Sequence, residues 1–251
     1  MQRIPKIIHY CWFGGNPKPK LVKECIASWK KHCPDYEIRE WNENNYDVSS
    51  CAFAREAYEA KKWAFVADYA RIDVLYRYGG IYLDTDMELL RPIDEFLEEE
   101  AFLGFECKDS PAAGIIGCIA KQTFISQLLE YYHDRHFICG DSCATTPSPV
   151  IMASLFQDNG AVLNGKKQTI CGCTIYPEQF FYPNGLLEIT KRHPKTAYSF
   201  HHYCASWYAG GGIWNRNLPQ RIKMYLVHKG RNLIGTSGMF ALSRKMKGGK
   251  P

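Results

Sequence analysis

The chain has 251 residues, of which 46% are hydrophobic and 23% are charged, and its formal net charge is +5. This length suits one large domain or two small ones, and the composition excludes intrinsic disorder for most of the chain. No apolar run reaches the roughly 18 residues that a membrane span needs, and the first residues lack the pattern of a secretory signal. We therefore expect a cytoplasmic protein without a transmembrane segment.

The first part of the sequence predicts a strand, a helix and a second strand. Residues 4–13 are nearly continuous in apolar side chains and end at two glycines, which is typical of a buried strand that enters a tight turn. Residues 21–32 carry apolar side chains at helical spacing and stop before Pro34. Residues 36–41 alternate and predict the second strand. This order favours an α/β layered fold with a parallel sheet.

The clearest element is a helix over residues 60–78, AKKWAFVADYARIDVLYRY. Gly79 and Gly80 follow it, and glycine is the natural left-handed residue at a helix end. A short apolar strand over residues 81–83 comes next and leads directly into acidic residues. Farther on, residues 114–120 predict a buried strand, and residues 124–133 and 148–156 predict helices.

The C-terminal part is basic, and the cysteines are numerous. Residues 216–251 contain nine Lys and Arg and no Asp or Glu. We expect one domain over residues 1–215 and a basic appendage over residues 216–251, which either contacts an anionic membrane surface or is solvated. Nucleic acid is disfavoured because no nucleic-acid motif accompanies the charge. The 11 cysteines include no C-x-x-C pair, which predicts reduced, mostly buried thiols.

Asp84 and Asp86 stand at the C-terminal end of the predicted strand 81–83. Ligands of open α/β sheets bind outside the carboxyl ends of the strands. Two carboxylates in one small volume are balanced by a hard divalent cation, whose remaining positions typically take substrate phosphates. The pattern indicates a metal site for a phosphorylated ligand, and a solvated acidic turn is the alternative.

Two further groups of residues fit such a site. Asp68 and Arg71 are three apart and share a helix face, where Arg can bind a phosphate and Asp can accept from sugar hydroxyls. The alternative is a weak surface ion pair. His201 and His202 could supply an imidazole to the same metal or could be core residues. Three glycines at 210–212 suit a flexible lid.

Three blocks, IPKIIHYCWFGG, DYARIDVLYRYGGIYLDTDME and HHYCASW, together resemble glycosyltransferase family 32. These are D-x-D sugar transferases of bacterial capsule and lipopolysaccharide synthesis and of yeast mannan synthesis. The central block is also similar to the catalytic domains of the large clostridial glucosylating toxins. The resemblance spans Ile4 to Trp207. It implies a GT-A fold, which is a Rossmann-like α/β/α sandwich with a mixed, mainly parallel central sheet.

The resemblance also implies catalytic roles, residue by residue. Asp86 would bind a manganese or magnesium ion directly, and Asp84 would contact ribose and sugar or bind the ion through water. Asp68 and Arg71 would hold the transferred sugar, with Arg71 also near the diphosphate. The further metal ligand would be His201, with His202 as the competitor.

Other matched positions imply contacts with the donor. Trp12 would flank the nucleotide base, Tyr82 would lie beside the donor, and Ser206 with Trp207 would contact the diphosphate. One departure is Ala113, where family members often carry Asn, so one polar contact to the donor sugar or acceptor is missing.

The resulting functional prediction is a metal-dependent, retaining glycosyltransferase. It transfers a sugar from a nucleotide-sugar donor, with a UDP-sugar favoured, to a saccharide or lipid-linked oligosaccharide in bacterial surface polysaccharide synthesis. A front-face transfer requires no separate protein base. The alternatives are a phosphatase of the haloacid-dehalogenase type, whose Asp-x-Asp normally follows the first strand, and a non-catalytic sugar-binding relative.

Overall fold

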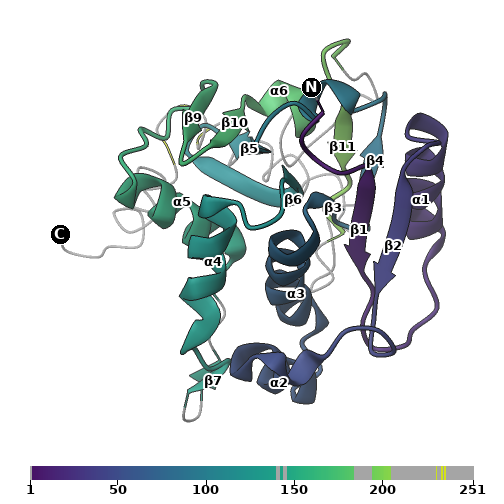
Figure 1. Ribbon diagram of the computed structural model, residues 1–251, viewed down its shortest axis with the longest axis vertical. Coiled ribbons are helices and arrows are strands. Elements are labelled where there is room, and N and C mark those ends of the chain that lie inside the picture. Colours follow the sequence, from purple (N-terminus) through teal and green to yellow (C-terminus); the bar gives the residue numbers. More distant parts are fainter. Residues whose placement is uncertain are drawn as a thin grey trace.

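A seven-stranded sheet forms the centre of the protein, a computed structural model whose described residues are 2–139, 142–143, 146–183, 194–204, 230, 233 and 235 (Figure 1). Its strand order is β2 (Glu37–Trp41), β1 (Ile7–Cys11), β3 (Gly80–Leu83), β6 (Ser110–Cys118), β5 (Ala101–Cys107), β10 (Cys173–Tyr176) and β9 (Gln168–Ile170). β1 is parallel to β2 and β3, and β10 is parallel to β5, whereas β6 and β9 run antiparallel to their neighbours. The predicted α/β class with a mixed, mainly parallel sheet is confirmed.

Helices and two small sheets surround the central sheet. The helices are α1 (Lys20–His32), α2 (Ala52–Glu59), α3 (Trp63–Tyr78), α4 (Thr123–His133), α5 (Ser148–Asp158) and α6 (Glu178–Phe181). Single 3-10 turns occupy Val48–Ser50 and Asp94–Phe96. One small sheet pairs β4 (Met87–Leu89) with β11 (Ser199–His201), and the other pairs β7 (Ile138–Cys139) with β8 (Ser142–Cys143).

Buried side chains point alternately to the two faces of the sheet, so the core consists of two layers. In β3, Ile81 and Leu83 pack into one buried cluster, which also contains Trp29 of α1. The intervening residue, Tyr82, packs into the other cluster, which contains Val66 of α3. Because side chains of a strand point alternately to its two faces, the sheet is covered on both sides. The result is the predicted α/β/α sandwich.

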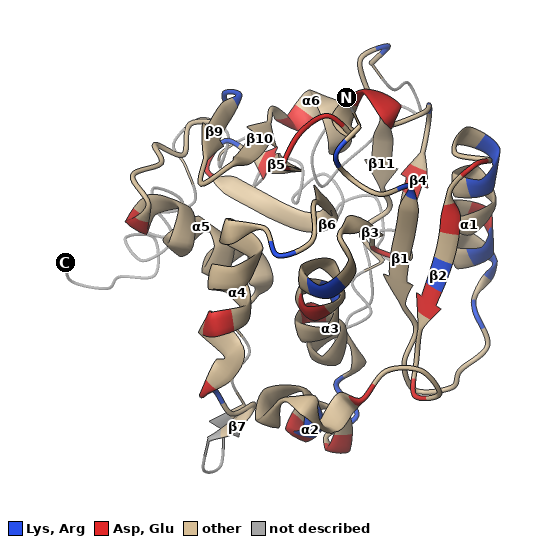
Figure 2. Cartoon of the chain, viewed as in Figure 1, with Lys and Arg blue, Asp and Glu red and all other residues tan. Residues whose placement is uncertain are grey.

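The charged side chains of α1 lie on the outside of this sandwich. α1 buries Val22, Cys25 and Trp29 toward the core and exposes Lys23 and Glu24. Figure 2 shows that the charges of α1 are mainly positive. The helix is therefore amphipathic, as its sequence spacing predicts.

The predicted helix 60–78 begins later than expected. α2 ends at Glu59, and α3 starts only at Trp63 because Lys61 adopts a left-handed conformation, with φ of +56°, that separates the two helices. α2 was not predicted from the sequence. At the other end, Gly79 has φ of +65°, and a Cβ there would lie 2.7 Å from the backbone nitrogen of Ala120. Glycine is thus required where α3 turns into β3.

Other predicted elements need correction or lie outside the described residues. The strand expected at 114–120 is Ser110–Cys118, because it continues as the antiparallel partner of β5, which the sequence patterns did not identify. β9, β10 and α6 were also missed. Ser206, Trp207 and the glycines 210–212 lie outside the described residues, as does most of the basic segment 216–251.

The described residues bear on two predictions from composition. Ten cysteines are free, and seven of these are buried: Cys11, Cys25, Cys33, Cys51, Cys107, Cys118 and Cys173. The buried character expected of most thiols is confirmed for these seven. Within the described ranges, none of the helices combines the length and hydropathy of a membrane span.

A buried histidine beside the central turn predicts acid sensitivity of the fold. His9 is 0% exposed, and its Nε2 lies 2.8 Å from the Gly79 carbonyl oxygen, which can only accept. Its Nδ1 therefore accepts from the Trp41 indole at 3.1 Å, and the ring is neutral. Burial lowers the pKa of His9 from 6.5 to about 4.

Because the unfolded chain protonates His9 near pH 6.5 and the folded chain does not, this stabilisation is complete above that pH. It is lost as the pH falls toward 4, by up to about 3 kcal/mol. Urea unfolding at several pH values measures the loss, and a His9→Gln variant, which cannot titrate, should show a shallower pH dependence than the wild type. Identical slopes for the two proteins would contradict the assignment.

Candidate active site

The two acids of the D-x-D motif occupy a tight turn at the carboxyl end of β3. The Asp84 amide donates to the Gly114 carbonyl at 2.8 Å, which extends the pairing with β6 by one residue. The Met87 amide donates to the Asp84 carbonyl at 2.9 Å and closes the turn into β4. Asp84 and Asp86 therefore lie at the sheet edge where the sequence predicts a ligand site.

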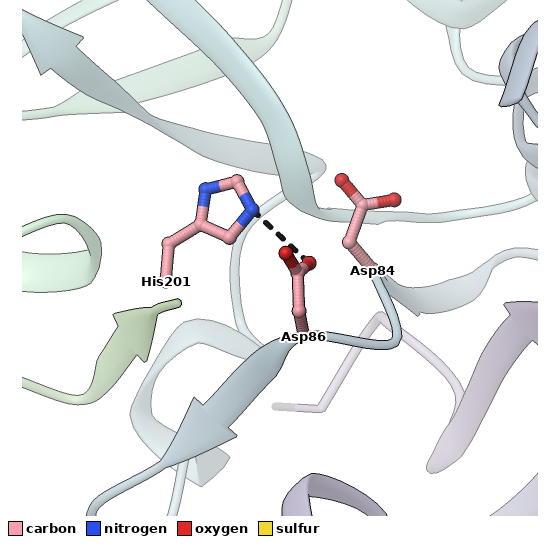
Figure 3. Close-up of side chains that lie close together, drawn as sticks. All are labelled: Asp84, Asp86 and His201. Carbon is pink, nitrogen blue, oxygen red and sulfur yellow. Dashed lines mark hydrogen bonds and ion pairs between the residues drawn. The ribbon is translucent and has the colours of Figure 1, made fainter. Parts of the chain in front are cut away.

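His201 joins these acids from a distant part of the chain (Figure 3). β11 pairs antiparallel with β4 and aligns His201 with Met87. His201 Nε2 lies 3.1 Å from Asp86 Oδ1, and the Cys204 amide donates to Asp86 Oδ2 at 2.8 Å. Ligand atoms of Asp84, Asp86 and His201 lie within 4.8 Å of one another.

The structure distinguishes between the two histidines that the sequence left open. His202 Nε2 lies 3.0 Å from Glu88 Oε2, and His202 is not part of the metal-type cluster. The cause is strand geometry, since consecutive residues at the end of β11 point to opposite sides. His201 alone of this pair faces Asp84 and Asp86.

Arg71 connects helix α3 to the acidic turn. Its side chain is 7% exposed, and Nη2 lies 3.0 Å from Asp68 Oδ1 and 3.1 Å from Asp84 Oδ1. Nη1 donates to the Ala113 carbonyl at 2.8 Å. The ion pair between Asp68 and Arg71 is thus buried and extended to Asp84, and the alternative of a surface pair is wrong.

Burial and neighbouring charges move the pKa values of these acids in opposite directions. Burial raises the pKa of Asp84, although the Arg71 guanidinium opposes this. Burial also acts to raise the pKa of Asp86, but His201 outweighs it and brings the pKa to about 2. For His201, burial favours the neutral form, yet the Asp86 carboxylate raises its pKa. Asp86 is therefore an ionised carboxylate in a buried setting.

The residues present fit a divalent cation. Two carboxylates and one imidazole are suitable ligands for manganese, and the carboxylates also suit magnesium. His201 Nδ1 is buried and has no hydrogen-bond partner among the described residues. The rings of Tyr182 and Tyr203 lie 5.9 and 4.0 Å from the imidazole ring and restrict its orientation. Asp84, Asp86 and His201 would hold the ion, whose charge would stabilise substrate phosphates.

The remaining predicted residues lie around this cluster or outside the described residues. Trp12 follows β1, which is parallel to β3, so it lies at the same sheet edge, and its indole donates to the Asn16 carbonyl at 2.7 Å. Tyr82 is 1% exposed, and its ring centroid lies 4.8 Å from Arg71 Cζ. Tyr82 supports the guanidinium from within the core. Ser206 and Trp207 are not described.

Some contributing residues were not found from the sequence. The Tyr182 hydroxyl accepts from the Ile115 amide at 2.9 Å. A Cβ on Gly114 would lie 3.2 Å from that hydroxyl and 3.4 Å from Asp84 Oδ2, so glycine leaves room for both. A glycine inside an apolar strand is the signal for such a close approach, but nothing in the sequence indicates which groups approach.

Part of the chain matches a known family. Residues 19–103 match the family model described as a glycosyltransferase sugar-binding region containing a DXD motif. This range includes Asp68, Arg71, Asp84 and Asp86 and ends before His201. The predicted resemblance to D-x-D sugar transferases is confirmed.

Relatives match over part of their length. Inositol phosphoceramide mannosyltransferase 1 of Schizosaccharomyces pombe is 28% identical over 114 residues, which are 41% of this chain and 34% of that protein. A human alpha-1,4-N-acetylglucosaminyltransferase is 30% identical over 77 residues, covering 30% of this chain and 22% of that one. The chain thus spans well under two thirds of these relatives.

One similar solved structure is that of the galactosyltransferase LgtC in complex with donor and acceptor sugar analogs. Its TM-score is 0.46 and its sequence identity is 11%, and the match covers 88% of this chain and 96% of that one. The PaToxG glycosyltransferase has a TM-score of 0.45 and 15% identity, over 62% of this chain and 69% of that one.

The buried position of Arg71 predicts a large loss of stability when it is removed. Arg71→Ala leaves Asp68 and Asp84 without their shared cation, which should lower the free energy of unfolding by about 3 kcal/mol. Arg77→Ala is the matched control, since this side chain is 43% exposed and pairs with Asp73 on the same helix, so its loss should cost under about 1 kcal/mol. Chemical unfolding of both variants measures the difference. Equal losses would show that the Arg71 network does not stabilise the fold.

Proposed function

We propose that this chain, whose residues 19–103 match the glycosyltransferase sugar-binding regions containing a DXD motif, is a metal-dependent glycosyltransferase that uses a nucleotide-sugar donor. The observation that carries the proposal is the junction of two groups at one sheet edge. One is the metal-type cluster of Asp84, Asp86 and His201. The other is the buried Arg71, which shares Asp84 with that cluster. Such an arrangement of fixed charges suits a diphosphate leaving group.

Each residue of the site has a proposed task. Arg71 faces charge that develops on the leaving diphosphate, and its contacts to Asp68 and to the Ala113 carbonyl keep the guanidinium in place. Asp68 accepts hydrogen bonds from hydroxyls of the transferred sugar. Asp84, Asp86 and His201 would hold a divalent cation, which would neutralise the charge of the donor phosphates. The acceptor hydroxyl attacks the anomeric carbon of the donor sugar on the face from which the phosphate oxygen departs. The new glycosidic bond forms as the bond to the phosphate oxygen breaks, and this oxygen takes the hydroxyl proton, so the configuration is retained.

The alternatives receive less support. A haloacid-dehalogenase phosphatase places its Asp-x-Asp after the first strand, whereas these acids follow β3. A non-catalytic sugar-binding relative does not require an ionised Asp86 beside His201 and a buried arginine at the same point. The transferase therefore accounts for more of the site than either alternative.

The donor sugar and the acceptor remain proposals from the sequence. The two relatives are named for mannosyl and N-acetylglucosaminyl transfer, so their names do not agree on a sugar. A UDP-sugar is favoured by the toxin-like central block, and a saccharide or lipid-linked acceptor of bacterial surface polysaccharide synthesis by the family resemblance. Arg71, Asp68 and Trp12 would contact the donor.

Removing Asp86 should abolish metal-dependent turnover. With a panel of UDP- and GDP-sugars and manganese, the wild type should slowly release nucleoside diphosphate from one donor, and Asp86→Ala should lower this rate by roughly 10²–10³-fold, because the cation loses a ligand. Release of inorganic phosphate from phosphomonoesters instead would favour the phosphatase. Full activity of Asp86→Ala with the metal chelated would contradict the assignment.

A matched pair of histidine variants controls for nonspecific damage. His201→Gln should weaken manganese activation by roughly 10–100-fold, whereas His202→Gln should leave it close to wild type, since His202 faces Glu88. Manganese titrations of the hydrolysis rate compare the two. Equal effects would remove His201 from the metal site.

We also propose that the basic segment 216–251 holds the enzyme at an anionic membrane surface on the cytoplasmic side. This segment carries nine of the 31 basic residues and no acid, so residues 1–215 contain 22 basic and 26 acidic side chains. The segment alone makes the chain positive, which suits attraction to anionic lipid.

Electrostatic attachment predicts salt sensitivity. Binding to vesicles of anionic lipid, followed by co-sedimentation, should be strong at about 0.05 M salt and should largely disappear near 0.5 M, as surface charges are screened. Vesicles of neutral lipid are the control. Binding that does not change with salt would refute the electrostatic attachment.

A further inference from the structure

A cavity of about 290 Å³ lies beside the end of α4, in the region where Figure 1 shows α4 approaching α2. Its walls come from α2, from the last turn of α4, from the residues that follow α4, and from the start of α5. The side chains that matter below are Phe53, Tyr131, Tyr132, Arg135, His136 and Ile151. None of them was singled out by the sequence, and none belongs to the metal-type cluster.

The lining is aromatic with a polar rim. Phe53, Tyr131 and Tyr132 form a continuous aromatic wall, with ring centroids 5.0 and 5.2 Å apart around Tyr132. At the rim, Arg135 stacks on Tyr131, with its Cζ 3.9 Å from the ring centroid, and its Nε donates to the Tyr131 carbonyl at 2.9 Å. Aromatic faces take up the apolar face of a flat ring at low entropic cost.

The charges at the rim have both signs. Arg135 brings donors, and the neighbouring Asp134 brings acceptors from a side chain that is 93% exposed. An anionic ligand would meet the Asp134 carboxylate, and a cationic one would meet Arg135. A neutral ligand with several hydroxyls can use both, and its ring can lie on the aromatic wall. The volume is at the lower end for ligand pockets, roughly 300–1,000 Å³, which suits one sugar ring.

Tyr132 separates this cavity from the sugar-holding side of the site. Its ring lies 5.8 Å from the ring of Tyr69, which follows Asp68 on α3. Burial raises the pKa of Tyr132, and the charge of the Asp68 carboxylate raises it further. Ser148, the first residue of α5, acts on the pKa of both groups. Tyr132 thus connects the cavity wall to the part of α3 that carries Asp68.

We propose that this cavity is a subsite for a neutral sugar ring of the acceptor, behind the Tyr132 side chain that contacts α3. The inference rests on the proposed transferase function, because only a transferase has an acceptor whose sugar ring could occupy the cavity. The aromatic wall binds the ring, and Asp134 and Arg135 bind its hydroxyls at the rim.

The test uses methyl glycosides as the probe, namely the α-glucoside, α-mannoside, β-galactoside and β-N-acetylglucosaminide. Saturation-transfer NMR on the full chain should show binding of at least one of them. Tyr131→Ala should weaken that binding about three- to tenfold, since one stacking face is removed. Tyr78→Ala is the matched control, because Tyr78 is a 39% exposed tyrosine at the far end of α3, and it should bind as the wild type does. Arg135→Ala, at an exposed position, repeats the test if Tyr131→Ala fails to fold.

Two further measurements separate this inference from the proposed function. Asp86→Ala should keep wild-type glycoside binding, because the cavity is distinct from the cluster. Donor hydrolysis without acceptor should be unchanged in Tyr131→Ala, whereas transfer to the bound glycoside should show a raised acceptor KM.

Two results would overturn the subsite. One is a wild type that binds none of the glycosides, and the other is binding that disappears in Asp86→Ala but persists in Tyr131→Ala. Binding that depends on Tyr131 in a protein without donor hydrolysis would keep a sugar site but refute the transferase and the acceptor assignment.

Discussion

The buried guanidinium of Arg71 is the interaction on which the arrangement of the site depends. It joins Asp68 of its own helix to Asp84 at the end of β3, and the Ala113 carbonyl of β6 accepts a third hydrogen bond. A charge that is buried this deeply must be paired, so helix and sheet can pack only with these groups in register. Tyr82 underneath and the glycine turn at Gly79 complete the junction between α3 and β3.

The cation-type cluster depends on a different pairing. His201 reaches Asp86 because β11 lies antiparallel to β4 and brings together parts of the chain that are more than 100 residues apart. The rings of Tyr182 and Tyr203 then hold the imidazole in place. A site assembled in this way is preorganised by the fold, so the cation proposed to bind there would meet ligands that are already positioned.

The cavity beside α4 is a second proposed binding region, separate from the metal-type cluster. Asp68 pairs with Arg71 beside the cluster, and the next residue, Tyr69, contacts Tyr132 of the cavity wall, so one turn of α3 lies near both the proposed donor region and the proposed acceptor region. A transferase has to bind two substrates with their reacting atoms adjacent, and proximity of this kind supplies a large part of the rate enhancement. The aromatic wall also assigns a task to part of the tyrosine surplus, which otherwise fills the core.

Short-range patterns in the sequence were sufficient to predict β1, α1, β2, the end of α3 at Gly79, and the acids that follow β3. The motif blocks additionally identified Asp68, Arg71, Asp84 and Asp86 as one site, because the family resemblance carries long-range information. Only the tertiary structure decided the rest. The choice of His201 over His202 depends on which face of β11 meets β4, the burial of Arg71 depends on the packing of α3 against the sheet, and the cavity exists only where α2, α4 and α5 converge. Contacts between distant segments leave no periodic signal in a single sequence, since each partner satisfies only its own local pattern.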